Sequence, residues 1–353
     1  MLARVRRVVP LVALAVAIVV GGWLVLSRPA SPPVPAKQPL GLQTSTARPS
    51  SSPARLADGA PYTPLLYADA TTSVGTAPLG SAERLVLRSP AGERELRRIE
   101  QSRYPQFLGF TVADGVLYWA ESTATPAGPY ETRLWRASLA AGEPATSLTA
   151  DTGAAVFFDS QYDLVVADGR VHWVAAPPDD APRTELRSVA LTGGPVTTEV
   201  IEGRFRWSAW PWRQSVDQQG PLRLVNHATG ETRTVTTAAA ETVGCTPTWC
   251  RSAVETGAGS NLFDVMHPDG SARRRIPGDV NAATVDTGLL DRYELFTDLD
   301  GEQVRLLAYD LGSGALTVLA TGVGLVVVHG GVVWWSAPPD DPTEWRALDL
   351  RTL

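Results

Sequence analysis

One short stretch of the chain holds the side chains best suited to ligand binding. It contains Arg204, Arg206, Trp207, Trp210, Trp212 and Arg213. Indole rings can stack on sugars and guanidinium groups can hold acidic partners, so these six residues are candidate binding residues. The alternative is packing, because Phe205 and Trp207 lie two residues apart, as do Trp210 and Trp212. Aromatic rings so spaced share one face of a strand, and we favour that interpretation.

The two cysteines of the chain, Cys245 and Cys250, bracket the turn-forming segment Thr246-Pro247-Thr248-Trp249. Outside the cytoplasm such a pair oxidises, so we predict a disulfide across a hairpin. A metal site would need further ligands, and the nearest preceding histidine, His227, lies eighteen residues before Cys245. Redox pairs are more often separated by two residues. A structural role is therefore expected.

The sequence carries no short motif of a known catalytic class. Gly-x-Ser-x-Gly, His-Glu-x-x-His and a phosphate-binding glycine loop are all absent. Asp298, Asp300 and Glu302 surround Gly301, but the other ligands of a calcium loop are missing, and we interpret them as a solvated turn. We assign no catalytic residue, no metal and no cofactor, and we favour a protein that is not an enzyme.

These residues lie in a sequence that repeats. Its clearest unit, Val112 to Glu121, places Asp114-Gly115 between two apolar segments, as in a tight hairpin. Decayed copies occupy 167–173 and 329–335, and the segment Ala-Pro-Pro-Asp-Asp occurs at both 176–180 and 337–341. Units of about forty residues, each with four strands, are typical of propeller blades.

We therefore predict an all-β, seven-bladed β-propeller of four-stranded antiparallel blades. Six blades are the alternative if the weak first unit is only an extension, and a β-sandwich is the other all-β possibility. The seventh unit stops one strand short, which favours closure of the ring by a strand from the amino-terminal side. Thr44 to Arg48 is the candidate for that strand.

The second unit carries a family resemblance. Leu117-Tyr118-Trp119-Ala120-Glu121, followed by Leu134-Trp135-Arg136-Ala137-Ser138-Leu139, resembles the repeat of the Tyr-Trp-Thr-Asp propellers of lipoprotein receptors. More widely, the chain resembles bacterial extracytoplasmic propellers related to the periplasmic protein of the Tol system. The resemblance implies a propeller that acts as a binding scaffold, and six blades are usual in the receptor family.

The amino terminus predicts a membrane anchor. Residues 8–26 are uncharged and mostly apolar, long enough as a helix to span a bilayer, and arginines precede them. We expect residues 1–7 in the cytoplasm, a transmembrane helix at 8–26, a Pro/Ser/Thr-rich tether at 27–53 and the propeller at 54–353. A cleaved secretory signal is the alternative, and both place the propeller outside the cytoplasm.

Charge and fold together limit the function. The formal net charge of −6 gives no basic surface for nucleic acid. We expect a single-pass, membrane-anchored binding, sensor or scaffold module for a cell-envelope protein, peptide or glycan. The alternative is an extracytoplasmic hydrolase or lyase acting on polysaccharide, because propeller enzymes can draw catalytic groups from several blades at the mouth of the channel.

Overall fold

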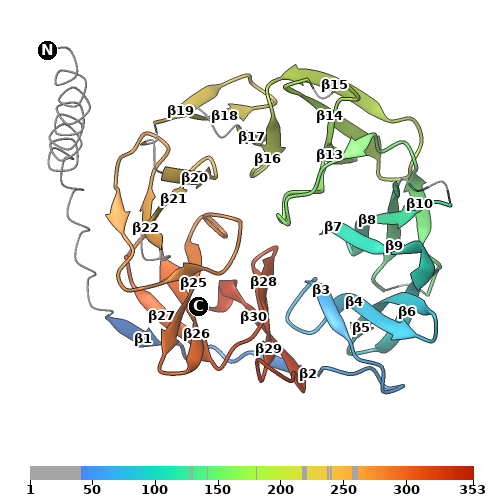
Figure 1. Ribbon diagram of the computed structural model, residues 1–353, viewed down its shortest axis with the longest axis horizontal. Helices are drawn as coiled ribbons and strands as arrows, with labels where there is room; N and C mark the ends of the chain where they lie inside the picture. The colour runs from blue at the N-terminus through green and yellow to red at the C-terminus, as the bar shows by residue number, and fades with distance from the viewer. Residues whose placement is uncertain are drawn as a thin grey trace, which may run out of the picture. The chain divides into compact units, whose positions relative to one another are not determined.

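The structure is a computed structural model that describes residues 41–353, except 127, 129, 141, 180, 217–220, 237, 239–240 and 257–260. Seven antiparallel sheets are arranged in a ring (Figure 1), which confirms the seven-bladed β-propeller; the six-bladed and sandwich alternatives are wrong. The predicted transmembrane segment, 8–26, lies outside the described residues. Within the described part of the chain, no helix is long and apolar enough to cross a membrane.

The first four blades follow one another along the chain. Blade 1 contains β3 (Thr63–Tyr67), β4 (Ser73–Leu79), β5 (Ala82–Ser89) and β6 (Gly92–Glu100). Blade 2 contains β7 (Gln106–Ala113), β8 (Val116–Ala124), β9 (Tyr130–Ser138) and β10 (Thr146–Thr149). Blade 3 contains β11 (Ala154–Ala155), β12 (Val165–Ala167), β13 (Arg170–Ala176), β14 (Arg183–Ala190) and β15 (Thr197–Glu202). Blade 4 contains β16 (Phe205–Trp207), β17 (Trp212–Ser215), β18 (Leu222–Asn226) and β19 (Thr232–Val235).

The last three blades complete the ring. Blade 5 contains β20 (Glu241–Cys245), β21 (Cys250–Glu255), β22 (Asn261–Met266) and β23 (Arg274–Arg275). Blade 6 contains β24 (Asn281–Ala282), β25 (Tyr293–Asp300), β26 (Gln303–Asp310), β27 (Leu316–Thr321) and the added strand β1 (Leu42–Thr44). Blade 7 contains β28 (Val326–His329), β29 (Val332–Ala337), β30 (Glu344–Asp349) and β2 (Ser50–Pro53). Short 3-10 turns, η2 (Gln101–Arg103) and η3 (Leu350–Thr352), follow β6 and β30.

The repeated dipeptide forms the turn that the sequence predicts. Asp114 and Gly115 have φ angles of 50° and 71°, and Asp168 and Gly169 have 50° and 69°. Two successive left-handed residues make the hairpin turn that matches the twist of the flanking strands. The turns bring the following tryptophans, Trp119 and Trp173, to the same place in blades 2 and 3.

These tryptophans fill the space between blades. Trp119 and Trp173 are fully buried, and each packs with apolar residues of the preceding blade. Trp335 does the same between blades 7 and 6. The residues that recur in the repeats therefore serve packing between blades, because the removal of apolar area from water is the main contribution that such residues make to stability.

The ring closes with a strand from the amino-terminal side, but not with the one expected. β2 pairs antiparallel to β30, with Ser50 opposite Ala347 and Pro53 opposite Glu344 (Figure 1). The predicted segment, Thr44 to Arg48, is wrong because residues 42–44 add instead to blade 6, where β1 runs parallel to β27. The serine-rich segment fits beside β30 because Ser52 shares a hydrogen bond of 3.2 Å with Tyr67 of blade 1.

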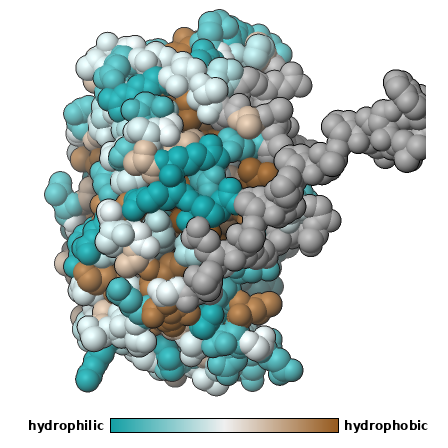
Figure 2. Space-filling view, turned by 90° about the vertical axis from the view of Figure 1, so that its left-hand side faces the viewer, coloured by the Kyte–Doolittle hydropathy of each residue, from teal (hydrophilic) through white to brown (hydrophobic). Residues whose placement is uncertain are grey.

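The antiparallel order gives the propeller two distinct ends. We call the turn face the end with the turns between first and second and between third and fourth strands, such as Asp114-Gly115. We call the loop face the opposite end, with the second-to-third strand loops, such as 177–182, and the connections between blades, such as 203–204. Figure 2 shows part of the outer side of the ring, where apolar atoms form separate spots among hydrophilic ones. This side therefore presents no broad apolar surface in that view.

Candidate functional site

Two innermost strands are interrupted, and the chain leaves them to fill the channel. In blade 3, β11 and β12 both pair with β13, and residues 156–164 loop out between them. In blade 6, β24 has only two residues before a loop at 283–292. We call these loops the blade 3 excursion and the blade 6 excursion.

The two excursions meet through Asp286. Ser160 Oγ donates a hydrogen bond of 2.6 Å to Asp286 Oδ1, and the Gln161 main-chain N–H donates one of 2.8 Å to Asp286 Oδ2. Blades 3 and 6 are not neighbours in the ring, so this contact crosses the channel. Asp286 is 5% exposed. Its carboxylate is thus a latch that fixes the blade 3 excursion.

Blade 7 also makes contacts across the channel, to the blade 3 excursion and to blade 2. The Gly330 N–H donates to Gln161 Oε1 at 3.1 Å, and His329 Nε2 lies 2.7 Å from the Phe110 carbonyl of blade 2. Because a carbonyl only accepts, His329 carries its proton on Nε2. Burial lowers the pKa of His329, which keeps it neutral near pH 7.

A second carboxylate shapes the blade 3 excursion from within. Asp163 is 5% exposed and accepts the N–H groups of Phe158, at 3.0 and 2.9 Å, and of Ser160, at 3.1 Å. Burial raises the pKa of Asp163 to about 7, although these main-chain donors lower it. The turn that Asp163 closes sets the position of Val156 and Phe158.

The blade 6 excursion has its own buried ion pair. Glu294 is fully buried and accepts from Arg251 Nη1 at 2.7 Å and from the Gly288 N–H at 2.6 Å. Arg251 also donates to the carbonyls of Thr284 and Asp286, at 2.8 and 3.1 Å. Burial raises the pKa of Glu294, and Arg251 opposes that rise. Both side chains therefore hold the loop that carries the latch.

Beside the filled channel, a pocket of about 290 Å³ opens on the loop face between blades 3 and 4. We call it the seam pocket. Its apolar lining is Val156, Phe158, Val174, Ala175, Ala176, Pro177, Ala181, Phe205 and Val216, and its polar lining is Arg183, Thr184 and Arg204. A mainly apolar pocket with a few charged groups is typical of ligand sites. The blade 3 excursion supplies one wall.

The two arginines of the seam pocket differ in their partners. Arg183 donates to Asp179 Oδ2, in an ion pair four residues apart. Arg204 is exposed, and although its main-chain carbonyl accepts from the Val216 N–H at 2.9 Å, its guanidinium has no hydrogen-bond or ion-pair partner among the described residues. The guanidinium of Arg204 is therefore the charge that the pocket offers to a ligand.

The repeated Ala-Pro-Pro-Asp-Asp segments have different surroundings. In blade 7 the second copy packs against Gly324, where an added Cβ would lie 2.9 Å from Pro339 Cα. In blade 3 the first copy contributes Ala176 and Pro177 to the lining of the seam pocket. The same loop sequence thus packs against the backbone in blade 7 and lines an open pocket in blade 3.

The structure separates the six candidate binding residues. The aromatic stretch is not one continuous strand: Phe205 and Trp207 are both buried in β16, the chain then turns, and β16 and β17 form a hairpin with Trp210-Pro211 in its turn. Arg204 lies at the seam pocket. Arg206 points toward the channel, where burial lowers its pKa and Asp286 and Asp163 oppose that effect. Trp207, Trp210 and Arg213 lie near the turn face, and Trp212 packs beside the disulfide.

A cluster of rings forms at the turn face. Trp210 lies between His172, at 4.4 Å, and Trp207, at 5.0 Å, and Trp207 contacts His227 at 5.6 Å between ring centroids. Arg213 Nη1 donates to His227 Nδ1 at 3.2 Å, so His227 carries its proton on Nε2. Burial lowers the pKa values of His172 and Arg213. The rings are in mutual contact, which agrees with a packing role.

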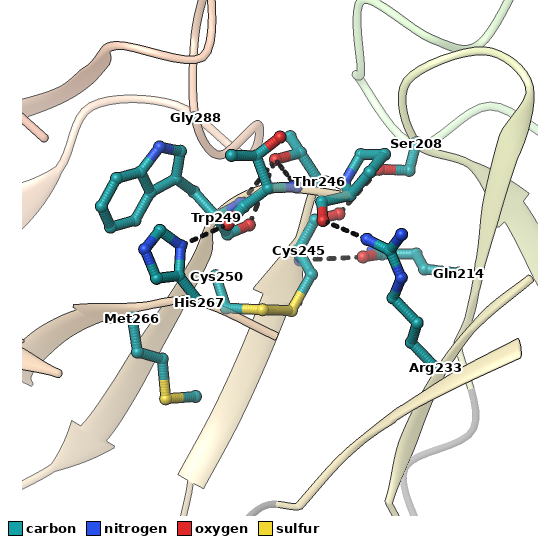
Figure 3. Close-up of a disulfide and its surroundings, with 12 residues drawn as sticks. Ser208, Gln214, Arg233, Cys245, Thr246, Trp249, Cys250, Met266, His267 and Gly288 are labelled. Carbon is teal, nitrogen blue, oxygen red and sulfur yellow. Dashed lines mark hydrogen bonds between the residues drawn. A yellow bond between two sulfur atoms is a disulfide. The ribbon is translucent and has the colours of Figure 1, made fainter. Parts of the chain in front are cut away.

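The disulfide is present as predicted. Cys245 and Cys250 are bonded across the β20–β21 hairpin and are 4% and 0% exposed (Figure 3). Gln214 Oε1 accepts from the Cys245 N–H at 2.9 Å, and Ser208 Oγ donates to the Cys245 carbonyl at 2.7 Å. The disulfide therefore links two neighbouring strands of blade 5, and blade 4 is hydrogen-bonded to the main chain of one of its cysteines, Cys245. No group of three or more His, Cys, Asp or Glu residues in the described part of the chain could hold a metal ion.

Sequence reasoning missed Asp163, Asp286 and the seam pocket. Asp286 lies in a polar segment with no strand pattern, and its partner Ser160 is 126 residues away. A usable signal was the extra length between the second and third units, since the turn glycines Gly142 and Gly194 lie 52 residues apart. That excess accommodates the blade 3 excursion.

Comparisons with known proteins agree with the fold. The sequence matches no protein-family profile and no curated protein. Among solved structures, a prolyl endopeptidase aligns with a TM-score of 0.50 and 11% identity, over 82% of this chain and 46% of that one. An uncharacterized protein from Listeria monocytogenes EGD-e aligns with a TM-score of 0.48 and 10% identity, over 90% and 96% of the two chains. A putative TolB from Agrobacterium tumefaciens aligns with a TM-score of 0.41 and 15% identity, over 72% and 93%.

The similarity to the prolyl endopeptidase shows the fold alone, because an identity of 11% does not transfer function. This chain spans about half the length of the prolyl endopeptidase. The activity of that enzyme is therefore not carried over, and the function must be argued from the seam pocket and the channel.

Proposed function

We propose that this chain is an extracytoplasmic binding or scaffold module of the cell envelope, held by a single amino-terminal membrane segment, and that it contacts its partner with the loop face. One observation carries the proposal: the loop face holds a preformed, mainly apolar pocket with an uncommitted arginine, Arg204. Pockets of this kind bind ligands through apolar contact and use a few polar groups for orientation.

One further observation supports the proposed location. The Cys245–Cys250 disulfide fits an oxidising compartment outside the cytoplasm.

The alternative, a polysaccharide hydrolase or lyase, needs carboxylates that are free to act on a substrate. In the described channel, Asp163, Asp286 and Glu294 each accept hydrogen bonds from main-chain N–H groups. Their geometry serves to hold the two excursions in place. Binding is therefore the function that this arrangement supports best.

Affinity capture from envelope extracts tests the proposal. The immobilised wild-type domain should retain a partner that an Ala181→Trp variant does not, because the added ring fills the seam pocket. Thr229→Trp, on the exposed turn after β18, is the matched control and should retain the partner. Equal retention by all three proteins would contradict binding at the loop face.

A further inference from the structure

The lining of the seam pocket selects among the possible ligands. Its one hydroxyl, on Thr184, donates to the Gly203 carbonyl at 2.8 Å and accepts from the Phe205 N–H at 2.9 Å. A sugar presents many hydroxyl groups, and apart from the guanidinium groups of Arg183 and Arg204 the pocket offers them few partners to replace the water that they would lose. The pocket is therefore poorly suited to a glycan.

The aromatic residues of the pocket lead to the same conclusion. Phe205 is 4% exposed, and the guanidinium groups of Arg213 and Arg223 lie 5.4 and 5.2 Å from its ring centroid. Its ring is thus unavailable as a stacking platform. The walls offer apolar contact from Val156, Phe158 and Pro177 instead.

Charge and size define the remaining possibility. Asp179 already pairs with Arg183, whereas the guanidinium of Arg204, at the pocket, has no partner among the described residues. A volume of about 290 Å³ corresponds to roughly ten water molecules, which is room for one or two side chains. The ligand should therefore combine one apolar group with a nearby anion.

We infer that the seam pocket binds a short acidic peptide segment of a partner protein, which inserts one apolar side chain and places an Asp or Glu carboxylate on Arg204. This inference rests on the proposed function and gives its ligand class. Guanidinium and carboxylate form a charge-assisted contact at the rim, while the apolar side chain supplies most of the buried area.

Two fluorescent probes separate the apolar contribution from the charge. 8-Anilinonaphthalene-1-sulfonate has an apolar body with one anionic group, and N-phenyl-1-naphthylamine has the same rings without a charge. Arg204→Gln should weaken binding of the anionic probe about fivefold, as expected for an exposed ion pair, and leave the neutral probe within about twofold. Arg133→Gln removes another exposed arginine, which lies in blade 2 beside Glu131, and should change neither probe.

Short peptides test the carboxylate itself. Acetyl-Phe-Asp-amide should displace the anionic probe at about fivefold lower concentration than acetyl-Phe-Asn-amide, which differs only in that group. Ala181→Trp should weaken both probes at least tenfold, which locates them in the pocket. If that variant melts at a lower temperature than the wild type, Ala181→Leu is the smaller block.

The outcomes distinguish this inference from the proposed function. If Ala181→Trp blocks both probes but Arg204→Gln does not discriminate between them, or if the two peptides compete equally, the acidic ligand class is wrong and the pocket remains a binding site. If neither probe responds to the block at position 181, the pocket is not the site, and the proposed use of the loop face also falls.

Discussion

Replacement of Asp286 by asparagine tests whether the latch across the channel holds the seam pocket in shape. The amide can keep one oxygen for the Ser160 hydroxyl, which lies 2.6 Å from the present carboxylate. Its NH₂ group would then face the Gln161 N–H, which in the wild type donates to the second carboxylate oxygen at 2.8 Å. If the amide flips, its oxygen accepts from the Gln161 N–H and its NH₂ group donates to Ser160 Oγ, so that in either orientation one buried donor, the Gln161 N–H or the Ser160 hydroxyl, loses its acceptor.

The cost follows from the hydrogen bonds that are lost. A buried donor left without a partner costs about 1–3 kcal/mol, and a hydrogen bond to a charged group contributes about 1.5–3 kcal/mol. We expect Asp286→Asn to lower the free energy of unfolding by about 2–3 kcal/mol. For a folded unit of about 300 residues, with about 2 cal/mol/K of unfolding entropy per residue, this corresponds to a Tm lower by about 3–5 °C.

Urea denaturation and calorimetry measure that loss, and probe binding measures its effect on the pocket. Because Asp286 fixes the excursion that carries Val156 and Phe158, the neutral naphthylamine probe should bind more weakly to the variant. Asp159→Asn is the matched control, since Asp159 lies exposed on the same excursion with a φ of 57°, which asparagine also tolerates.

A double-mutant cycle with Ser160→Ala completes the test. The two substitutions remove the same hydrogen bond, so their combined effect should be smaller than the sum of the single effects. If the free energy of unfolding of Asp286→Asn lies within about 0.5 kcal/mol of the wild-type value, or equals that of Asp159→Asn, then Asp286 does not hold the two excursions together as described.

Three further predictions address the rest of the fold. Burial raises the pKa of Asp163 to about 7 in the folded protein, whereas the pKa of an aspartate in the unfolded chain is about 4. The contribution of Asp163 to the free energy of unfolding is therefore complete below pH 4 and is lost as the pH rises through 7. The free energy of unfolding of the wild type, relative to Asp163→Asn, should therefore fall between pH 4 and pH 8; a constant difference would contradict the shifted pKa. Reduction of Cys245–Cys250 should lower the free energy of unfolding by about 2 kcal/mol in urea titrations, and a Cys245→Ala/Cys250→Ala variant should not respond to reductant. Removal of residues 1–53 takes away β1 and β2 and exposes the edge of β30, so it should lower the Tm and promote aggregation in light scattering more than removal of residues 1–49, which takes away β1 and keeps β2; equal behaviour of the two truncations would show that β2 does not close the ring.

The regular part of the fold could be predicted from the sequence because each blade repeats the same local physics. Asp114-Gly115 and Asp168-Gly169 adopt the left-handed turn that their residue types favour, and Trp119 and Trp173 fill equivalent spaces between blades. The disulfide could be predicted for the same reason, since Cys245 and Cys250 belong to one hairpin. Local periodicity and turn chemistry are sufficient for such features.

The candidate site could not be predicted because its contacts join distant parts of the ring. Ser160 and Asp286 meet only after blades 3 and 6 have been placed on opposite sides of the channel. Within the aromatic stretch, Arg204 lies just before β16, at the seam pocket, whereas Arg206 lies inside β16 and interacts electrostatically with Asp286 and Asp163. A one-dimensional pattern shows neither the break in the strand nor the direction of each side chain.

That a strand from the amino-terminal side closes the ring could be predicted, but not which residues form that strand. A seventh unit one strand short requires a partner for β30, but any short extended segment could supply it. The choice of Ser50–Pro53 depends on Tyr67 and Ala347, which accommodate small hydroxyl side chains at the junction of blades 1 and 7.

Site-specific photo-cross-linking in cells of the source species tests the binding function most directly. A photo-reactive residue at Glu202, exposed on the loop face beside the seam pocket but not part of its lining, should form an adduct with a partner protein, and the Arg204→Gln substitution should reduce that adduct. The same residue at Thr229, exposed at the turn face, should not form it. Adducts of equal yield at both positions, or none at position 202 while position 229 reacts, would contradict the account that the seam pocket is the binding site.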